Sequence, residues 1–148
     1  MQLMARDRGL AELVSELRGK RVMIWTCNTC ARLCDVGGSS NAQRLATALR
    51  SEGIDVTSVA AAKAACIASS AKENGGKQSE SCDTVLVLAC DAACRVAERV
   101  FSKPCLNPVI TIGPGYLSED GVPVSVEGPE DTLESLSDKK GLPAGPFV

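Results

Sequence analysis

Residues 22–34 read Val-Met-Ile-Trp-Thr-Cys-Asn-Thr-Cys-Ala-Arg-Leu-Cys, an apolar run that leads directly into three cysteines. The run is short and continuous, which is typical of a strand that is buried on both faces of a parallel sheet. Cys27, Cys30 and Cys34 follow it in a C-x-x-C-x-x-x-C spacing. The pattern therefore places sulfur at the carboxyl end of a predicted strand.

A second apolar strand, predicted over residues 84–89, is followed in the same way by Cys90 and Cys94. Strands alternate with helices along the chain, which predicts an α/β fold: a small doubly wound parallel sheet of about four strands with flanking helices. We further predict helices at 10–17, 42–49 and 93–100, strands at 54–59 and within 106–112, and a polar surface loop at 72–81.

The composition changes after residue 112, and this change predicts two parts. Residues 1–112 form the α/β cysteine-rich, cluster-binding domain. Residues 113–148 contain no cysteine and are rich in proline and glycine. We expect this segment to be an extended tail with one short helix near 131–136, and to be either a flexible terminus or an arm that becomes ordered on binding a partner.

The chain has 148 residues, eight of them cysteine and none histidine. A chain of this length builds a core without disulfide staples, so the cysteines are not needed for stability. No secretory signal and no apolar run long enough for a membrane span are found, which predicts a cytoplasmic, reducing location. Clustered cysteines in such a compartment indicate a metal site or redox chemistry. Without histidine, no Ser-His or Cys-His catalytic pair exists, and no catalytic residue is assigned.

The charge pattern argues against a nucleic-acid partner. The net charge is −2, the charges of both signs are intermixed, and aromatic residues make up 3% of the chain. Neither a basic stripe for phosphates nor a platform for stacking bases is available from such a composition.

The predicted topology brings the cysteines together. In an open parallel sheet, ligands bind at the carboxyl ends of the strands, where the strand order reverses. Thiolates there are also favoured by the amino ends of helices, and Cys90 is expected to start one. The candidate cofactor-binding residues are Cys27, Cys30, Cys34, Cys66, Cys90 and Cys94, and all of these except Cys94 are predicted metal ligands.

These sulfur atoms suit either an iron–sulfur cluster or a four-cysteine zinc site, and spacing does not choose between them. Eight cysteines would suffice for one cluster or for two. Cys82 and Cys90 flank the same predicted strand and lie roughly 26 Å apart along it, so one site does not use both. Cys82 is expected to be structural or a surface thiol, and Cys105 is either a buried small residue or a ligand.

Two segments, residues 24–38 and residues 85–92, resemble the cysteine-rich small subunit or C-terminal domain that accompanies methylenetetrahydrofolate reductase in acetogens and other anaerobes. The resemblance spans roughly residues 10–113. The family has a Cys-Gly-Thr-Cys run that closes on a further cysteine, a Gly-Gly turn, and a later Ala-Cys-Gly-Ala-Gly; Asp91 here replaces a glycine of that motif. Five cysteines match family cysteines: Cys27, Cys30, Cys34, Cys66 and Cys90.

The resemblance implies an iron–sulfur or metal-binding electron-transfer subunit. We therefore expect an accessory subunit of a larger redox complex, with a cluster of the 4Fe-4S type and a larger, flavin-containing partner. The missing nucleotide fingerprints agree with a flavin that belongs to that partner. Two alternatives remain at this point. One is a zinc-binding structural or interaction module, and the other is a thiol–disulfide oxidoreductase that uses Cys27 and Cys30.

Overall fold

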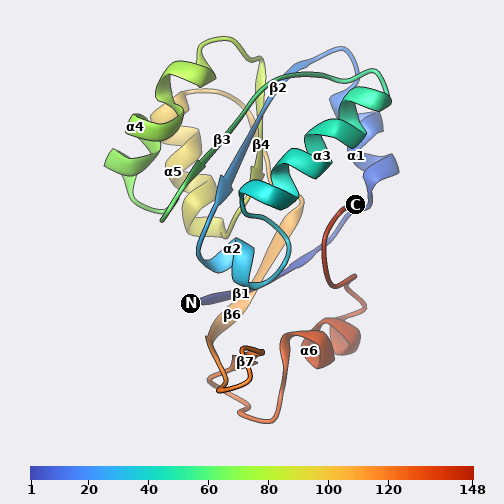
Figure 1. The fold of residues 1–148 in the computed structure, drawn as a ribbon, viewed down its shortest axis with the longest axis vertical. Coiled ribbons are helices and arrows are strands. Elements are labelled where there is room, and N and C mark those ends of the chain that lie inside the picture. Colours follow the sequence, from blue (N-terminus) through green and yellow to red (C-terminus); the bar gives the residue numbers. More distant parts are fainter.

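The computed structural model describes residues 1–148 and contains two sheets (Figure 1). The elements of the larger, α/β part are α1 (Leu10–Leu17), β2 (Arg21–Cys27), α2 (Cys30–Leu33), α3 (Ser39–Ser51), β3 (Asp55–Ala62), α4 (Ala68–Ser79), β4 (Thr84–Leu88), α5 (Asp91–Phe101) and β5 (Cys105–Leu106). The smaller part, which we call the antiparallel lobe, consists of β1 (Gln2–Arg6), β6 (Val109–Leu117), β7 (Pro123–Ser125) and α6 (Leu133–Lys140).

The larger sheet is parallel, with the strand order β3-β2-β4-β5. Every residue of β4 and all of β2 except Arg21 are buried, because helices cover both faces. Continuous apolar strands are what such a doubly covered sheet requires. The prediction of a doubly wound α/β fold with about four parallel strands is confirmed. The order reverses between β2 and β4, so the crevice between their carboxyl ends is the expected ligand site of this topology.

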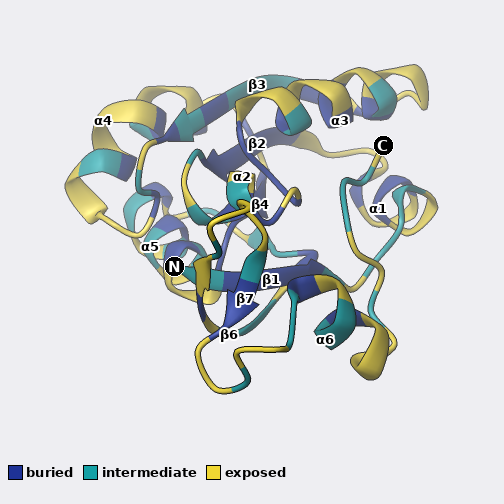
Figure 2. Cartoon of the chain, turned by 60° about the horizontal axis from the view of Figure 1, so that its bottom comes forward, coloured by how far each residue is buried: buried dark blue, intermediate teal, exposed yellow.

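The two faces of the parallel sheet carry different cores (Figure 2). On one face, α1 and α3 pack aliphatic side chains against Val22 and Ile24 of β2. On the other face, Met23, Trp25 and Cys27 contribute to a core that includes residues of α2, α4 and α5. Successive side chains of a strand point to opposite faces, so the odd-numbered residues of β2 share one face with the buried sulfur atoms.

The predicted loop at residues 72–81 is wrong, because most of it belongs to helix α4. This helix turns Gly75 toward the sheet, where a Cβ atom would lie 2.7 Å from Cζ of Phe101 and 3.0 Å from Cζ3 of Trp25. Glycine is therefore required by close packing at a position where it would ordinarily weaken a helix. The longest helix, α3, has 13 residues. None of the helices combines the length and the hydropathy needed to cross a membrane.

The antiparallel lobe differs from the predicted extended tail. β6 runs across the expected boundary at residue 112 and pairs with β1 on one side and β7 on the other. The end of the chain returns to the lobe and to the α/β part: the guanidinium of Arg6 donates to the carbonyl of Gly145 at 2.9 Å and lies over the ring of Phe147. The helix expected near 131–136 is α6. The segment after residue 112 is therefore built into the fold together with the first six residues.

Candidate metal centre

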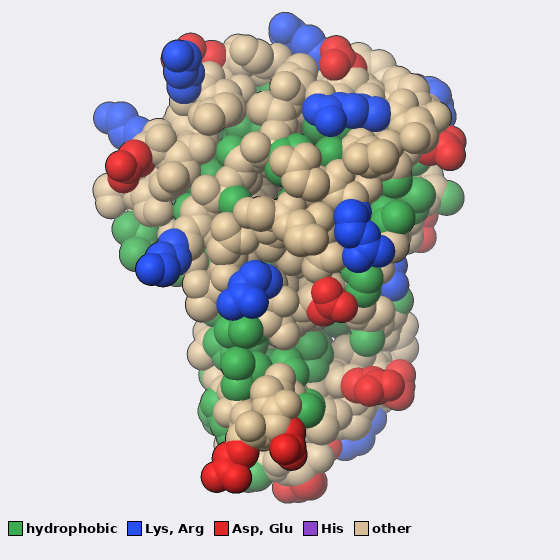
Figure 3. Space-filling model, viewed as in Figure 1, with side chains coloured by type: hydrophobic (Ala, Val, Ile, Leu, Met, Phe, Trp, Pro, Cys, Tyr) green, Lys and Arg blue, Asp and Glu red, His purple; other side chains and the backbone are tan.

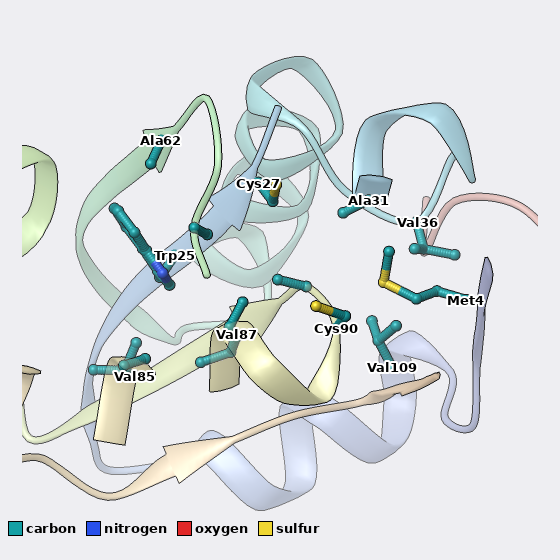
Figure 4. Close-up of a cluster of buried hydrophobic side chains, with 14 of the residues drawn as sticks. Met4, Trp25, Cys27, Ala31, Val36, Ala62, Val85, Val87, Cys90 and Val109 are labelled. Carbon is teal, nitrogen blue, oxygen red and sulfur yellow. The ribbon is translucent and has the colours of Figure 1, made fainter. Parts of the chain in front are cut away.

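The carboxyl ends of β2 and β4 hold cysteines at the point where the strand order reverses. Cys27 is the last residue of β2, and Cys90 is the N-cap of α5, two residues after the end of β4. Both side chains are buried and face the core that the alanines and valines of this end of the sheet complete (Figure 4). We call this region the cysteine rim; its members are Cys27, Cys30, Cys34, Cys66 and Cys90.

The loop after β2 is tied to the loop after β3. The backbone N–H of Asn28 donates to the carbonyl of Ala62 at 2.8 Å, and the hydroxyl of Thr29 donates to the carbonyl of Lys63. Helix α2 then begins at Cys30, and Cys34 follows one turn later, with its N–H donating to the carbonyl of Cys30 at 3.0 Å. These bonds hold the C-x-x-C-x-x-x-C segment beside the loop that carries Cys66.

The Gly37-Gly38 turn lets the backbone pass close to this rim. A Cβ atom on Gly37 would lie 2.6 Å from Oγ1 of Thr26, 2.7 Å from the carbonyl oxygen of Leu88 and 2.8 Å from Cβ of Ala31. Thr26 is buried and donates to the carbonyl of Leu88 at 2.8 Å, while its oxygen accepts from the N–H of Gly38 at 2.8 Å. The hydroxyl therefore fixes the turn after α2 to the end of β4.

Three loops contribute sulfur atoms to one neighbourhood. Burial raises the pKa of Cys90, the amides of Ala93 and Ala92 at the start of α5 partly offset this rise, and the charges of Cys66 and Cys30 add to it. Cys30, Cys66 and Cys90 follow β2, β3 and β4, so they lie toward the same end of the parallel sheet. Cys90 starts a helix as predicted, but burial outweighs the helix amides, and its pKa is raised rather than lowered.

Cys27 and Cys34 are directed to backbone carbonyls. Cys34 donates to the carbonyl of Gln2 at 3.4 Å and Cys27 to that of Lys63 at 3.7 Å. Burial raises the pKa of Cys34 to about 11, although the amide of Met4 lowers it and the charge of Cys30 raises it further. Cys34 is therefore a neutral thiol at pH 7, held against strand β1.

No three cysteine, aspartate or glutamate side chains stand in an arrangement that could hold a metal ion. The donor set nevertheless fits a thiolate-ligated centre, because soft sulfur ligands are those that iron–sulfur clusters and zinc accept. A metal binds sulfur only after the thiol proton has left, so the rim would bind it with proton release and with rotation of Cys27 and Cys34 away from their carbonyls. The candidate ligands thus lie toward the same end of the parallel sheet but are not pre-assembled.

Cys94 lies beside the rim and faces another environment. It follows Cys90 by one helical turn, and its sulfur lies 4.0 Å from Oε1 of Glu98. Burial, followed by the charges of Glu98 and Asp91, raises the pKa of Cys94 to about 11. Together with Arg95 these side chains line an open pocket of about 460 Å³. Two carboxylates that compete with the thiolate make Cys94 a weaker candidate ligand than the five rim cysteines.

Cys82 and Cys105 lie toward the opposite, amino-terminal end of the parallel sheet. Cys82 precedes β4, is fully buried and donates to the carbonyl of Ser79 at 3.2 Å. Cys105 is paired with Val85 near the start of β4. Burial, followed by the charge of Cys94, raises the pKa of Cys105 to about 12. Cys82 is therefore a buried core residue, and Cys105 is partly buried and packs against the same core.

Several residues that shape the rim were not singled out in the sequence. Thr26 ties the turn after α2 to β4, and a polar residue at the end of an otherwise apolar run is the signal that would have found it. Asn28 accepts from the N–H of Ser39 at 2.8 Å, so a residue from another loop satisfies the first turn of α3. No sequence signal marks Gln2, because the contact between its carbonyl and Cys34 depends on where β1 lies in the fold.

Comparisons with models of known protein families, with curated proteins and with solved structures found no match to the chain. The function is therefore inferred from the rim itself.

Proposed function

We propose that this chain binds an iron–sulfur cluster through its cysteine rim and serves as an electron-transfer accessory subunit of a larger redox complex. One observation supports this most strongly: the segments after three neighbouring parallel strands, β2, β3 and β4, all carry cysteine at the end of the sheet where the strand order reverses. A structural core has no need of sulfur from three loops at one place.

The rim cysteines would hold the cluster, with Cys30, Cys66 and Cys90 as the central ligands and Cys27 or Cys34 as the fourth. When bound, a 4Fe-4S cluster supplies one-electron transfer. On the β4 side the chain contributes buried apolar side chains, because Val87 and Ala89 are fully buried on the same face as Cys27 and Cys90. It contributes an exposed wall at Cys66, whose side chain lies at the surface. Electrons would enter and leave on that exposed side.

The experiment is metal and acid-labile sulfide analysis of anaerobically purified full-length protein. We expect iron and sulfide in equal amounts and a visible absorbance band that bleaches reversibly on reduction. Cys30→Ser combined with Cys90→Ser should abolish both. Cys82→Ser combined with Cys105→Ser is the matched control, because it removes the same number of sulfur atoms and should leave both unchanged. Equal losses of iron and sulfide in the two double variants would contradict the assignment of the cluster to the rim cysteines.

Zinc is the second candidate, because the same four-sulfur donor set satisfies tetrahedral zinc. Colourless protein with stoichiometric zinc, lost in the rim variant alone, would assign this module in place of the cluster. Thiol–disulfide exchange at Cys27 and Cys30 has less support, since Cys27 is 7% exposed and an attacking thiol must be reached by its substrate.

The partner that we propose is the larger, flavin-containing redox subunit that the resemblance to the methylenetetrahydrofolate reductase family implies. The antiparallel lobe offers a surface for it. Residues 113–148 carry seven acidic and two basic side chains. Figure 3 shows acidic side chains at the tip of this lobe and hydrophobic ones beside them. The exposed hydrophobic residues of the lobe include Tyr116, Leu117, Val122 and Val126. A basic, partly apolar surface would complement them.

A further inference from the structure

The surface around Cys66 combines an exposed sulfur atom with an exposed hydrophobic side chain. Cys66 is the only exposed cysteine of the rim, and Ile67, which follows it, is 51% exposed. Ile67 is also the N-cap of α4, where no side chain caps the helix. Serine or aspartate would stabilise this position and isoleucine does not, so neither capping nor burial accounts for Ile67.

Three basic side chains lie around this pair of residues. The guanidinium of Arg32 donates to the carbonyl of Asn28 at 2.9 Å, and the N–H of Asn28 donates to the carbonyl of Ala62 at 2.8 Å. Arg32 of α2 therefore lies beside the loop that begins at Lys63. Lys72 lies one turn after the first residue of α4 and on the same side of the helix.

The chain itself does not neutralise these basic side chains. Arg32, Lys63 and Lys72 are exposed, and none of them forms an ion pair. Glu73 is the only acidic residue between residues 56 and 79, a stretch that contains three lysines. The lobe has the opposite charge: Figure 3 shows several basic side chains on the α/β part and acidic ones at the tip of the lobe. We call this surface the Cys66 face; its members are Arg32, Lys63, Cys66, Ile67 and Lys72.

We infer that the Cys66 face is a docking surface for a small, acidic carrier of single electrons. Carboxylates of such a carrier would pair with the three basic side chains, which would also steer it toward the face. Ile67 would provide the apolar contact beside the exposed thiol. Small interfaces of this kind are typical of transient electron-transfer complexes, in which the partner leaves after each transfer.

This docking surface rests on the proposed electron-transfer function, and it places the cluster between two different partners. Cys34 donates to the carbonyl of Gln2 in the lobe, whereas Cys66 lies at the surface. The rim therefore reaches from the acidic lobe, the proposed surface for the larger subunit, to the basic Cys66 face. In the transfer, the reduced carrier loses one electron and the oxidised cluster gains it, and no bond forms or breaks.

Binding of flavodoxin, a small acidic flavoprotein that carries single electrons, tests the surface in a step that needs no metal. Isothermal titration calorimetry with the full chain should show binding at low salt. Added salt should weaken it, because charges are screened over about 10 Å at 0.1 M ionic strength. Lys63→Glu combined with Lys72→Glu should weaken binding by about tenfold. Arg18→Glu combined with Lys20→Glu is the matched control: it changes the net charge equally, at the opposite end of the parallel sheet, and should bind as wild type.

Ile67→Ser separates an interface role from a structural one. Serine is the better N-cap, so thermal unfolding should occur at no lower temperature, while flavodoxin binding should weaken several-fold. In protein that contains the cluster, stopped-flow reduction by flavodoxin hydroquinone should slow when Lys63 and Lys72 are both replaced by glutamate. Reduction by dithionite should not slow, because this small reductant does not need the docking surface.

Wild-type protein that does not bind flavodoxin at low salt, or equal weakening in the two double variants, would overturn the docking surface and leave the cluster assignment intact. Wild-type affinity in Ile67→Ser would likewise contradict the apolar contact. Protein without iron that still binds flavodoxin through Lys63 and Lys72 would instead refute the proposed cluster and support the surface.

Discussion

The two faces of the parallel sheet are built from the same strands but have different side chains. The α1/α3 face contains no cysteine: its buried core consists of leucine, isoleucine, valine and alanine. The opposite face contains all four fully or nearly buried cysteines, with three more packed at its edge. The alternation of side chains along β2 and β4 produces this separation. The aliphatic core therefore lies on one face of the sheet, and the thiols lie on the other.

The largest expected effect is on the aliphatic face. Leu45→Ala removes a side chain that is 1% exposed and leaves a cavity under α3. We expect the free energy of unfolding to fall by about 3 kcal/mol, as for buried leucines generally. Urea unfolding measures this loss, and iron content per folded molecule should stay at the wild-type value. A folded Leu45→Ala protein without iron would show that the two faces are not independent.

The sulfur face should respond to alkaline pH. The ordinary pKa of a cysteine thiol is about 9. Below that pH the Cys34 thiol is protonated in both the folded and the unfolded chain, so its full contribution to the free energy of unfolding is present. Between pH 9 and about 11 the unfolded chain loses this proton first, so metal-free protein loses stability. We expect a loss of about 2 kcal/mol from this group. Chemical unfolding at several pH values measures it.

Cys34→Ala is the matched control for this pH dependence, since the substitution removes this thiol and leaves the other buried thiols in place. The remaining slope should come from Cys82, Cys90, Cys94 and Cys105, because burial raises the pKa of each of them as well. If the free energy of unfolding of Cys34→Ala fell with pH as steeply as that of the wild type, the pH dependence would not come from Cys34.

Thr26→Val tests the hydrogen bonds that join the turn after α2 to the end of β4. Valine has nearly the same shape, but the N–H of Gly38 loses its acceptor. Leaving this buried donor unpaired should cost about 1.5 kcal/mol. Thermal unfolding measures the cost, and faster loss of iron to a chelator would show that the turn after α2 has loosened. Thr47→Val, on the exposed side of α3, is the control for the substitution itself.

The smallest effect is expected for Cys82→Ala. This buried sulfur donates only to the carbonyl of Ser79, and its removal should lower the free energy of unfolding by about 1 kcal/mol. Iron and sulfide content should be unchanged. Loss of metal in this variant would mean that metal binding depends on a cysteine outside the rim as well as on the rim cysteines.

The parts of the fold that could be predicted are those whose pattern is local. β2 and β4 are continuous apolar runs, so their burial and the position of Cys27 and Cys90 at their ends followed from the sequence. Helix α4 was missed because its contact with the core depends on Gly75 lying against Trp25, and this contact leaves no apolar stripe. The directions of the thiols depend on such distant neighbours too: Cys34 donates to Gln2, which lies 32 residues away.

β1 escaped prediction for a related reason, since five residues of mixed polarity become a strand only when β6 pairs with them. During synthesis, about a hundred residues separate these two strands, which at ribosomal rates is an interval on the order of 5 to 20 s. All of the rim cysteines have been translated before β6, while the carbonyl of Gln2 that later holds Cys34 is still unanchored. The growing polypeptide therefore passes through a period of seconds in which these sulfur atoms have been made but the amino terminus has not yet closed over Cys34.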